Sequence, residues 1–137
     1  VIVFDNRFIS ERVIQIRNWN LEFIHGDILD KDLVKKHFFD ADVVHHLAGI
    51  TDVPRTKSDS SDLKDKKIKL VAEKGTQNIL DAINNKCKII FPSTHVVYEG
   101  IDKVKKDIQE EELTKPVLSY SSSKAFNEKQ IINSDVR

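Results

Sequence analysis

The chain has 137 residues, the size of one ordinary domain, with the 39% hydrophobic and 32% charged residues of a soluble globular protein. Its 22 basic and 22 acidic side chains cancel, so no global charge directs it to nucleic acid or to an anionic membrane. No apolar run approaches the roughly 20 residues of a membrane span, and the start, VIVFDN, lacks the zones of a signal peptide. We therefore expect a cytoplasmic protein without nucleic-acid or membrane partners.

Short apolar runs alternate with helix-like stretches along the chain. The β-branched, continuous runs are typical of strands buried on both faces, and we predict strands over residues 1 to 4, 21 to 25, 41 to 48 and 87 to 93. Between and after them we predict helices over residues 10 to 17, 31 to 39, 61 to 85 and 117 to 133, with Ser10 and Asp30 as the N-caps of the first two. This alternation predicts a parallel, doubly wound α/β sheet.

Two features carry little functional information. The polar, turn-rich stretch from 51 to 67 is expected to be a surface loop that runs into the third helix, with its charges either solvated or bordering a ligand site. The single cysteine, Cys87, cannot form an internal disulfide, which fits a reducing compartment, and we expect it to be a buried structural thiol.

Polar and small residues follow the predicted strands, at the edge where a doubly wound sheet binds ligands. Asp5 ends the first strand, where a carboxylate can bind the hydroxyls of an adenine ribose and repel the 2′-phosphate of NADP; turn chemistry is the alternative reason for an aspartate there. Asp27 follows the second strand and Gly26. Ala48 and Gly49 close the third strand and allow another group to approach the backbone closely.

The pair His45 and His46 lies in the third predicted strand. Adjacent residues of a strand point to opposite faces, so the two rings cannot easily chelate one ion. We therefore predict no metal site.

The stretch YSSSK, residues 120 to 124, places a phenol four positions before an ammonium. Residues four apart on a helix share a face, so Tyr120 and Lys124 could hold their polar ends close together, either as an exposed structural pair or as a catalytic one.

Six segments in order resemble the extended short-chain dehydrogenases/reductases, specifically the NAD-dependent nucleotide-sugar epimerases and dehydratases. They cover essentially the whole chain and are VIVFDN, FIHGDILD, DVVHHLAGI, EKGTQNILDAI, IIFPSTHVVYEG and KPVLSYSSSKAFNE. The resemblance implies a Rossmann-like fold, the cofactor NAD, a nucleotide-sugar substrate and a homodimer. It also implies cofactor contacts from Asp5, Asn6, Asp27, Ile28, Leu47, Ala48, Gly49 and Lys124.

By the same resemblance, Tyr120 would be the general acid/base, and the ammonium of Lys124 would favour its ionised form. Thr94 would hydrogen-bond the substrate oxygen, with Ser93 as the competing candidate for that role. Tyr98 would shape the site, and His95 would be a packing or pocket-wall residue.

The sequence departs from the family pattern in three places. It has no glycine-rich loop and no first strand, so we expect a partial fold with a gap between the strands that start at Val1 and Ala41. Ala72 stands where the family usually has an asparagine. The substrate-binding region is not present, so the 137 residues resemble the middle of a larger protein.

The interpretation is an NAD-dependent nucleotide-sugar epimerase or dehydratase, represented by residues 1 to 137 as a partial NAD-binding domain. The segment PSTHVV has no acidic residue beside Thr94, which favours an epimerase. The alternatives are an NAD-dependent dehydrogenase or reductase of the same fold, and a non-catalytic binding module.

Overall fold

The computed structural model describes residues 1–51, 62–101 and 106–136. The described strands are β1 (Ile2–Asp5), β2 (Glu22–His25), β3 (Val43–His45) and β4 (Lys88–Ile90). The described helices are α1 (Ser10–Asn18), α2 (Lys31–Phe38), α3 (Asp62–Ala82), the 3₁₀ helix η2 (His95–Tyr98) and α4 (Ser119–Ile132). Across these ranges, no helix combines the length and apolarity that crossing a membrane demands.

The predicted α/β class with parallel strands is confirmed, and each predicted strand and helix is found near its expected position. The short helix η2 was not predicted. Residues 62 to 67, which the predicted loop shared with the predicted third helix, are helical; residues 52 to 61 of that loop lie outside the described residues.

The strands form two separate pairs. β1 pairs in parallel with β2, with Ile2 opposite Glu22, and β3 pairs in parallel with β4, with Val43 opposite Lys88. Within the described residues, no hydrogen-bonded ladder joins β1 to β3. The expected gap between these two strands is therefore present.

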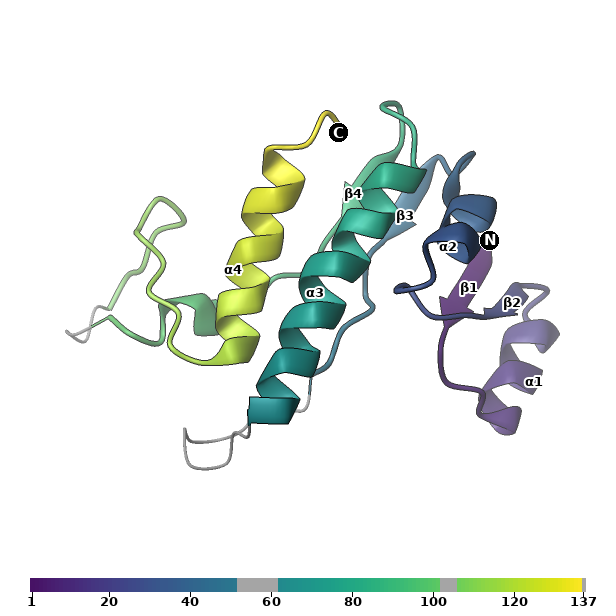
Figure 1. Cartoon of the computed structure of the whole chain (residues 1–137), viewed down its shortest axis with the longest axis horizontal. Helices are drawn as coiled ribbons and strands as arrows, with labels where there is room; N and C mark the ends of the chain where they lie inside the picture. The colour runs from purple at the N-terminus through teal and green to yellow at the C-terminus, as the bar shows by residue number, and fades with distance from the viewer. Residues whose placement is uncertain (52–61, 102–105, 137) are drawn as a thin grey trace.

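Helices cover the two strand pairs differently (Figure 1). At one end of the molecule, Val3 and Phe23 line the same cavity as residues of α1, on one face of β1 and β2. On the other face, the ring of Phe4 packs edge-on against that of Phe38, the last residue of α2, at a centroid distance of 5.3 Å. At the other end, α3 and α4 lie side by side over β3 and β4. The first pair thus has the doubly wound arrangement.

The expectation that the strands are buried on both faces is wrong for β3 and β4. Val44 is 7% exposed, whereas its neighbour Val43 is 45% exposed and Ile90 is 49% exposed. The side chains alternate because only one face of this pair is covered by helices among the described residues. The apolar runs at these strands therefore do not reflect two-sided burial here.

The core lies between the strands and the helices α2 and α3. Its buried members are Ile28, Val34, Val44, Ile79, Ala82, Ile83 and Cys87. Cys87 is fully buried, as predicted, and burial raises the pKa of its thiol. This cluster connects α3 to both strand pairs and so fixes where their carboxyl ends lie.

One predicted N-cap is confirmed and the other is wrong. Asp30 accepts a hydrogen bond from the backbone N of Leu33 at 3.0 Å and caps α2. Ser10 is instead the first residue of α1, whose N-cap is Ile9, without a side-chain cap. The first helical hydrogen bond is the one from the backbone N of Val13 to the carbonyl of Ile9 at 3.0 Å.

Gly26 joins β2 to Asp27 at a point of close packing. A Cβ atom there would lie 2.5 Å from the ring of Phe4 and 2.6 Å from the side chain of Leu33. We expect Gly26→Ala to lower the free energy of unfolding by about 1 to 3 kcal/mol, because the Phe4 ring is held against Phe38. Chemical denaturation measures this change in the free energy of unfolding.

The matched control is Gly49→Ala, because a Cβ atom at Gly49 would meet no atom of the described residues within 4 Å. This change should alter the free energy of unfolding by less than about 0.5 kcal/mol. Equal stability losses for the two variants would contradict the packing argument.

Candidate functional site

The carboxyl ends of β1 and β2 bring together three predicted cofactor residues. Asn6 donates a hydrogen bond from Nδ2 to Oδ2 of Asp27 at 3.1 Å, and the other Asp27 oxygen accepts from the backbone N of Leu29 at 2.9 Å. Asp5 ends β1, and its Oδ1 accepts from the backbone N of Arg7 at 2.7 Å. The two carboxylates are thereby held on adjacent strand ends.

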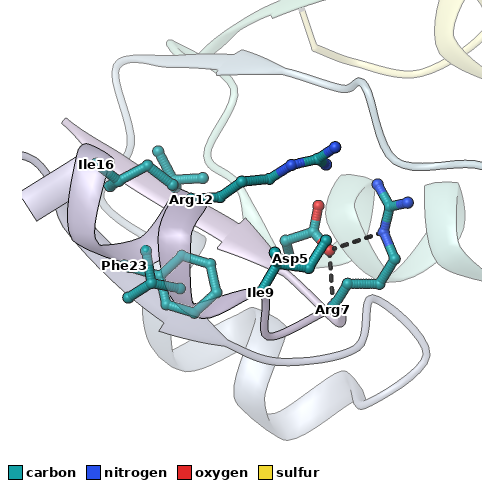
Figure 2. Close-up of a pocket in the computed structure, with 8 residues that line it drawn as sticks. Asp5, Arg7, Ile9, Arg12, Ile16 and Phe23 are labelled. Atoms are coloured by element: carbon teal, nitrogen blue, oxygen red, sulfur yellow. Dashed lines mark hydrogen bonds and ion pairs between the residues drawn. The ribbon is translucent and has the colours of Figure 1, made fainter.

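A small cavity lies beside Asp5 (Figure 2). It encloses about 50 Å³, well below the roughly 300 Å³ at which small-molecule pockets begin, and it is lined by Val3, Asp5, Arg7, Ile9, Arg12, Val13, Ile16 and Phe23. Figure 2 shows the side chains of Asp5, Arg7 and Arg12 grouped on one side of it. The Arg7 Nε lies 3.7 Å from Asp5 Oδ1. This cavity is therefore too small to enclose a nucleotide.

The segment after β3 is open to solvent. Leu47 is 68% exposed, and Ala48 and Gly49 are also exposed. Ile28 differs from the other predicted cofactor residues, because its side chain belongs to the core and its carbonyl accepts a hydrogen bond from Asn78 Nδ2 at 2.8 Å. Its side chain is thus not available to a ligand.

Lys124 reaches from α4 to the end of β4. Its Nζ donates to the carbonyl of Pro92 at 2.8 Å and lies 4.3 Å from the centroid of the Phe91 ring. Burial lowers the pKa of Lys124, and the carboxylate of Glu128 opposes this shift. Glu128 also accepts a hydrogen bond from the hydroxyl of Ser93.

Thr94 and Tyr120 lie on the two elements that this contact joins. Thr94 is the N-cap of η2, and its Oγ1 accepts from the backbone N of Val96 at 3.3 Å, which leaves its hydroxyl hydrogen to donate elsewhere. Tyr120 is in the first turn of α4, half-buried, and its hydroxyl makes no hydrogen bond within residues 1–51, 62–101 and 106–136. Tyr120 and Lys124 share a face of α4.

Tyr98 and His95, the two other residues that the sequence placed near this site, differ in exposure. The hydroxyl of Tyr98 donates to the carbonyl of Glu110 at 3.4 Å, and His95 is exposed. Sequence reasoning missed Phe91 and Glu128. Glu128 was detectable, because it lies four residues after Lys124 on the predicted helix.

A buried polar network connects α4 to α3 and to the residue that follows β3. His46 Nε2 lies 2.8 Å from Thr76 Oγ1, which also accepts from Asn127 Nδ2 at 2.7 Å. These three residues are 2%, 0% and 3% exposed, whereas His45 is exposed, so the two histidines face opposite sides as expected. Burial, and then the charge of Lys124, lower the pKa of His46 to about 4. The network links the segment after β3 to α3 and α4.

Residues 1–137 match the 3-beta hydroxysteroid dehydrogenase/isomerase family. The CDP-paratose 2-epimerase of Salmonella typhi is 37% identical over 93 residues, 63% of this chain and 25% of that protein. The 3beta-hydroxysteroid-dehydrogenase/decarboxylase isoform 2 of Arabidopsis thaliana is 30% identical over 128 residues, 89% of this chain and 21% of that protein. The chain thus spans about a quarter of the length of these relatives or less.

The fold is also similar to that of solved structures. The UDP-glucose 4-epimerase from Bifidobacterium longum, crystallised with NAD+ and UDP, superposes with a TM-score of 0.78 and 29% identity, over 97% of this chain and 41% of that one. Together with the epimerase relative, this confirms the resemblance to nucleotide-sugar epimerases and dehydratases that the sequence indicated.

The pKa of His46 predicts a pH-dependent stability. In the unfolded chain a histidine binds a proton below about pH 6.5, whereas folded His46 does so only near pH 4. The unfolded state therefore binds more protons between these values, and the free energy of unfolding should fall by about 3 kcal/mol as the pH drops from 6.5 to 4. Denaturant titrations across this range measure it.

The comparison is with His46→Asn, which lacks the titrating ring and should lose less stability over the same pH range than the unmutated chain. His95→Gln is the matched control, because His95 is exposed. An unchanged pH dependence in His46→Asn would show that His46 is not the buried neutral group.

Proposed function

Because this chain belongs to the 3-beta hydroxysteroid dehydrogenase/isomerase family, we propose that it is the partial NAD-binding domain of an enzyme that oxidises a hydroxyl group of a nucleotide sugar. The observation that carries the proposal is the hydrogen bond from Lys124 to the Pro92 carbonyl. It holds α4 at the end of β4, so that Tyr120 and Thr94 belong to one edge of the fold. The carboxyl ends of parallel strands are also where this class of fold binds its cofactors.

The residues at the strand ends fit NAD. Asp5 and the Asn6–Asp27 pair offer hydrogen-bond acceptors for the hydroxyls and amine of an adenosine, and the exposed segment from Leu47 to Gly49 leaves room for a nucleotide to pass. The NAD+ in the similar epimerase structure supports this assignment. When bound, NAD supplies the hydride acceptor.

The chain's own residues would handle the proton. The Tyr120 oxygen would take the proton of the substrate hydroxyl as that hydroxyl is oxidised to a carbonyl, with bound NAD as the acceptor of the hydride. The Thr94 hydroxyl hydrogen-bonds the same oxygen and aligns it with Tyr120. Ser93 is less suited to this role, because Glu128 already binds its hydroxyl. Lys124 lies one turn after Tyr120 on the same face of α4 and places its ammonium at the end of β4.

A nucleotide sugar is the substrate class that the epimerase relative and the similar structure favour. The residue after Thr94 is His95 rather than an acid, which favours epimerisation over dehydration. A second candidate is a 3β-hydroxysteroid, since the matching family and the Arabidopsis relative carry that name. Both substrates present a secondary hydroxyl to the same Tyr120 and Thr94.

The cofactor assignment predicts a preference for NAD in the whole protein. Asp5→Ala should weaken NAD binding by roughly tenfold, because a carboxylate that accepts ribose hydroxyls is lost. NADP binding should be weakened less, since the same carboxylate repels its 2′-phosphate. The ratio of the NADP dissociation constant to the NAD dissociation constant, measured by calorimetry, should therefore fall.

Asp40→Ala is the matched control, because Asp40 is an exposed aspartate that follows α2 rather than a strand. It should leave both dissociation constants unchanged. Equal or tighter binding of NADP by the unmutated protein would refute the assignment of Asp5.

The catalytic assignment predicts that Tyr120→Phe lowers turnover of the whole protein by about 10² to 10⁴, with the fold retained, because only the titrating oxygen is removed. Tyr98→Phe is the matched control, since it removes a hydroxyl that binds the Glu110 carbonyl instead. Turnover is measured on CDP-, UDP-, GDP- and dTDP-sugars and on a 3β-hydroxysteroid, which separates the two substrate classes.

Thr94→Val should cost about 1 to 3 kcal/mol of transition-state stabilisation, the size of one lost hydrogen-bond partner, and Ser93→Ala should cost less. Near-normal turnover by Tyr120→Phe on the substrate that the unmutated protein uses would mean that Tyr120 is not the base.

A further inference from the structure

A carboxylate from outside α4 holds the start of this helix. The Oε1 atom of Glu99 accepts hydrogen bonds from the backbone N of Val117 and of Leu118, each at 2.8 Å, and from the hydroxyl of Ser121. Glu99 directly follows η2 and is its C-cap residue. One oxygen atom thus binds three donors at or before the first turn of the helix that carries Tyr120.

The helix needs such a partner. The first backbone N–H groups of an α-helix have no acceptor within the helix, and a negative charge near them is favourable. The N-cap of α4 is Leu118, which has no side-chain oxygen to offer and makes no cap bond. Glu99 brings a carboxylate to this start from 18 to 22 residues away, and it accepts from the N–H of Leu118 as the glutamate of a capping box accepts from the N–H of an N-cap residue.

The neighbouring backbone is joined in the same way. The backbone N of Lys115 donates to the carbonyl of Val97 at 2.9 Å, and the backbone N of Gly100 donates to the carbonyl of Lys115 at 2.9 Å. A Cβ atom at Gly100 would lie 2.4 Å from the Lys115 carbonyl oxygen, so only glycine allows this approach. Residues 97–100 and 115–118 thus form one connected unit.

This unit joins the two halves of the proposed reaction site. Thr94 starts η2, Glu99 follows its end, and Glu99 binds the residues that immediately precede Tyr120. A displacement of α4 along β4 would change the position of Tyr120 relative to Thr94. Because misplacement of reacting groups by about 1 Å can cost 10²-fold in rate, the contact has a direct chemical consequence.

We infer that Glu99 is a positioning residue, which sets Tyr120 against Thr94 by binding the start of α4 to the end of η2. The inference rests on the proposed function, since it takes Tyr120 and Thr94 as the groups that meet the substrate. Glu99 itself does not touch the substrate.

The experiment compares Glu99→Ala and Glu99→Gln in the whole protein. Ala removes all three hydrogen bonds, whereas Gln keeps an acceptor oxygen without the charge. We expect kcat to fall by roughly 10- to 100-fold in Glu99→Ala and by less in Glu99→Gln. KM for NAD should change less than kcat, because Asp5 and Asp27 lie on the other strand pair and only Lys124 among the proposed cofactor contacts is on α4.

Glu111→Gln is the matched control, because Glu111 is exposed and makes no hydrogen bond or ion pair within the ranges that the structure describes. The decisive readout is a double-mutant cycle. If Glu99 acts through Tyr120, Glu99→Ala should have no further effect on turnover in a Tyr120→Phe background, whereas a general loss of structure would add to it. Amide hydrogen exchange at Val117 and Leu118 should accelerate in both Glu99 variants, which reports the contact independently of turnover.

Normal kcat in Glu99→Ala beside an inactive Tyr120→Phe would overturn this inference and leave the proposed function standing. Additive losses in the double mutant would also overturn it, because Glu99 would then only stabilise the fold. Normal turnover by Tyr120→Phe would overturn the proposed function itself, and the inference with it.

Discussion

The hydrogen bond from the Lys124 ammonium to the Pro92 carbonyl connects two segments that are 32 residues apart in sequence. It brings the polar face of α4 to the end of β4, where Thr94 begins η2. Together with the Glu99 contacts at the start of α4, it fixes the element that carries Tyr120 relative to the element that Thr94 begins. The buried network of His46, Thr76 and Asn127 supports the same face of α4 from the side of α3, since all three side chains are hydrogen-bonded where water cannot reach them.

The charges around the Lys124 ammonium fit the role that we propose for this residue. Burial lowers the pKa of Lys124, and the Glu128 carboxylate one turn further along α4 works against that shift. His46 lies in the same region and is a neutral ring above about pH 4, so it adds no second positive charge near Lys124 at neutral pH. The ammonium of Lys124 thus lies at the strand end, on the face of α4 that also carries Tyr120.

Periodicity and capping predicted the element order, and the order of motifs predicted the family, because both depend on local sequence. Asp30 capped its helix as expected, while Ser10 did not, since the N-cap of α1 is Ile9, one residue earlier than predicted. The exposure of Val43 and Ile90 could not be read from their apolar runs, because it depends on which helices cover the sheet. Likewise, Asp5, Asp27, Tyr120 and Lys124 were proposed as site residues from the order of the six matching segments, and these assignments stay predictions. The contacts of Phe91, Asn127 and Glu99 link distant segments and leave no local pattern.

The central claim is that Tyr120 and Thr94 act on a single substrate oxygen. A crystal structure of the whole protein with NAD and a substrate, or an inert analogue of it, measures this directly. The account predicts that the Tyr120 hydroxyl and the Thr94 hydroxyl both lie within about 3.2 Å of the same substrate oxygen, with Lys124 beside them. A substrate oxygen bound by other side chains, with Tyr120 facing away from it, would contradict the account.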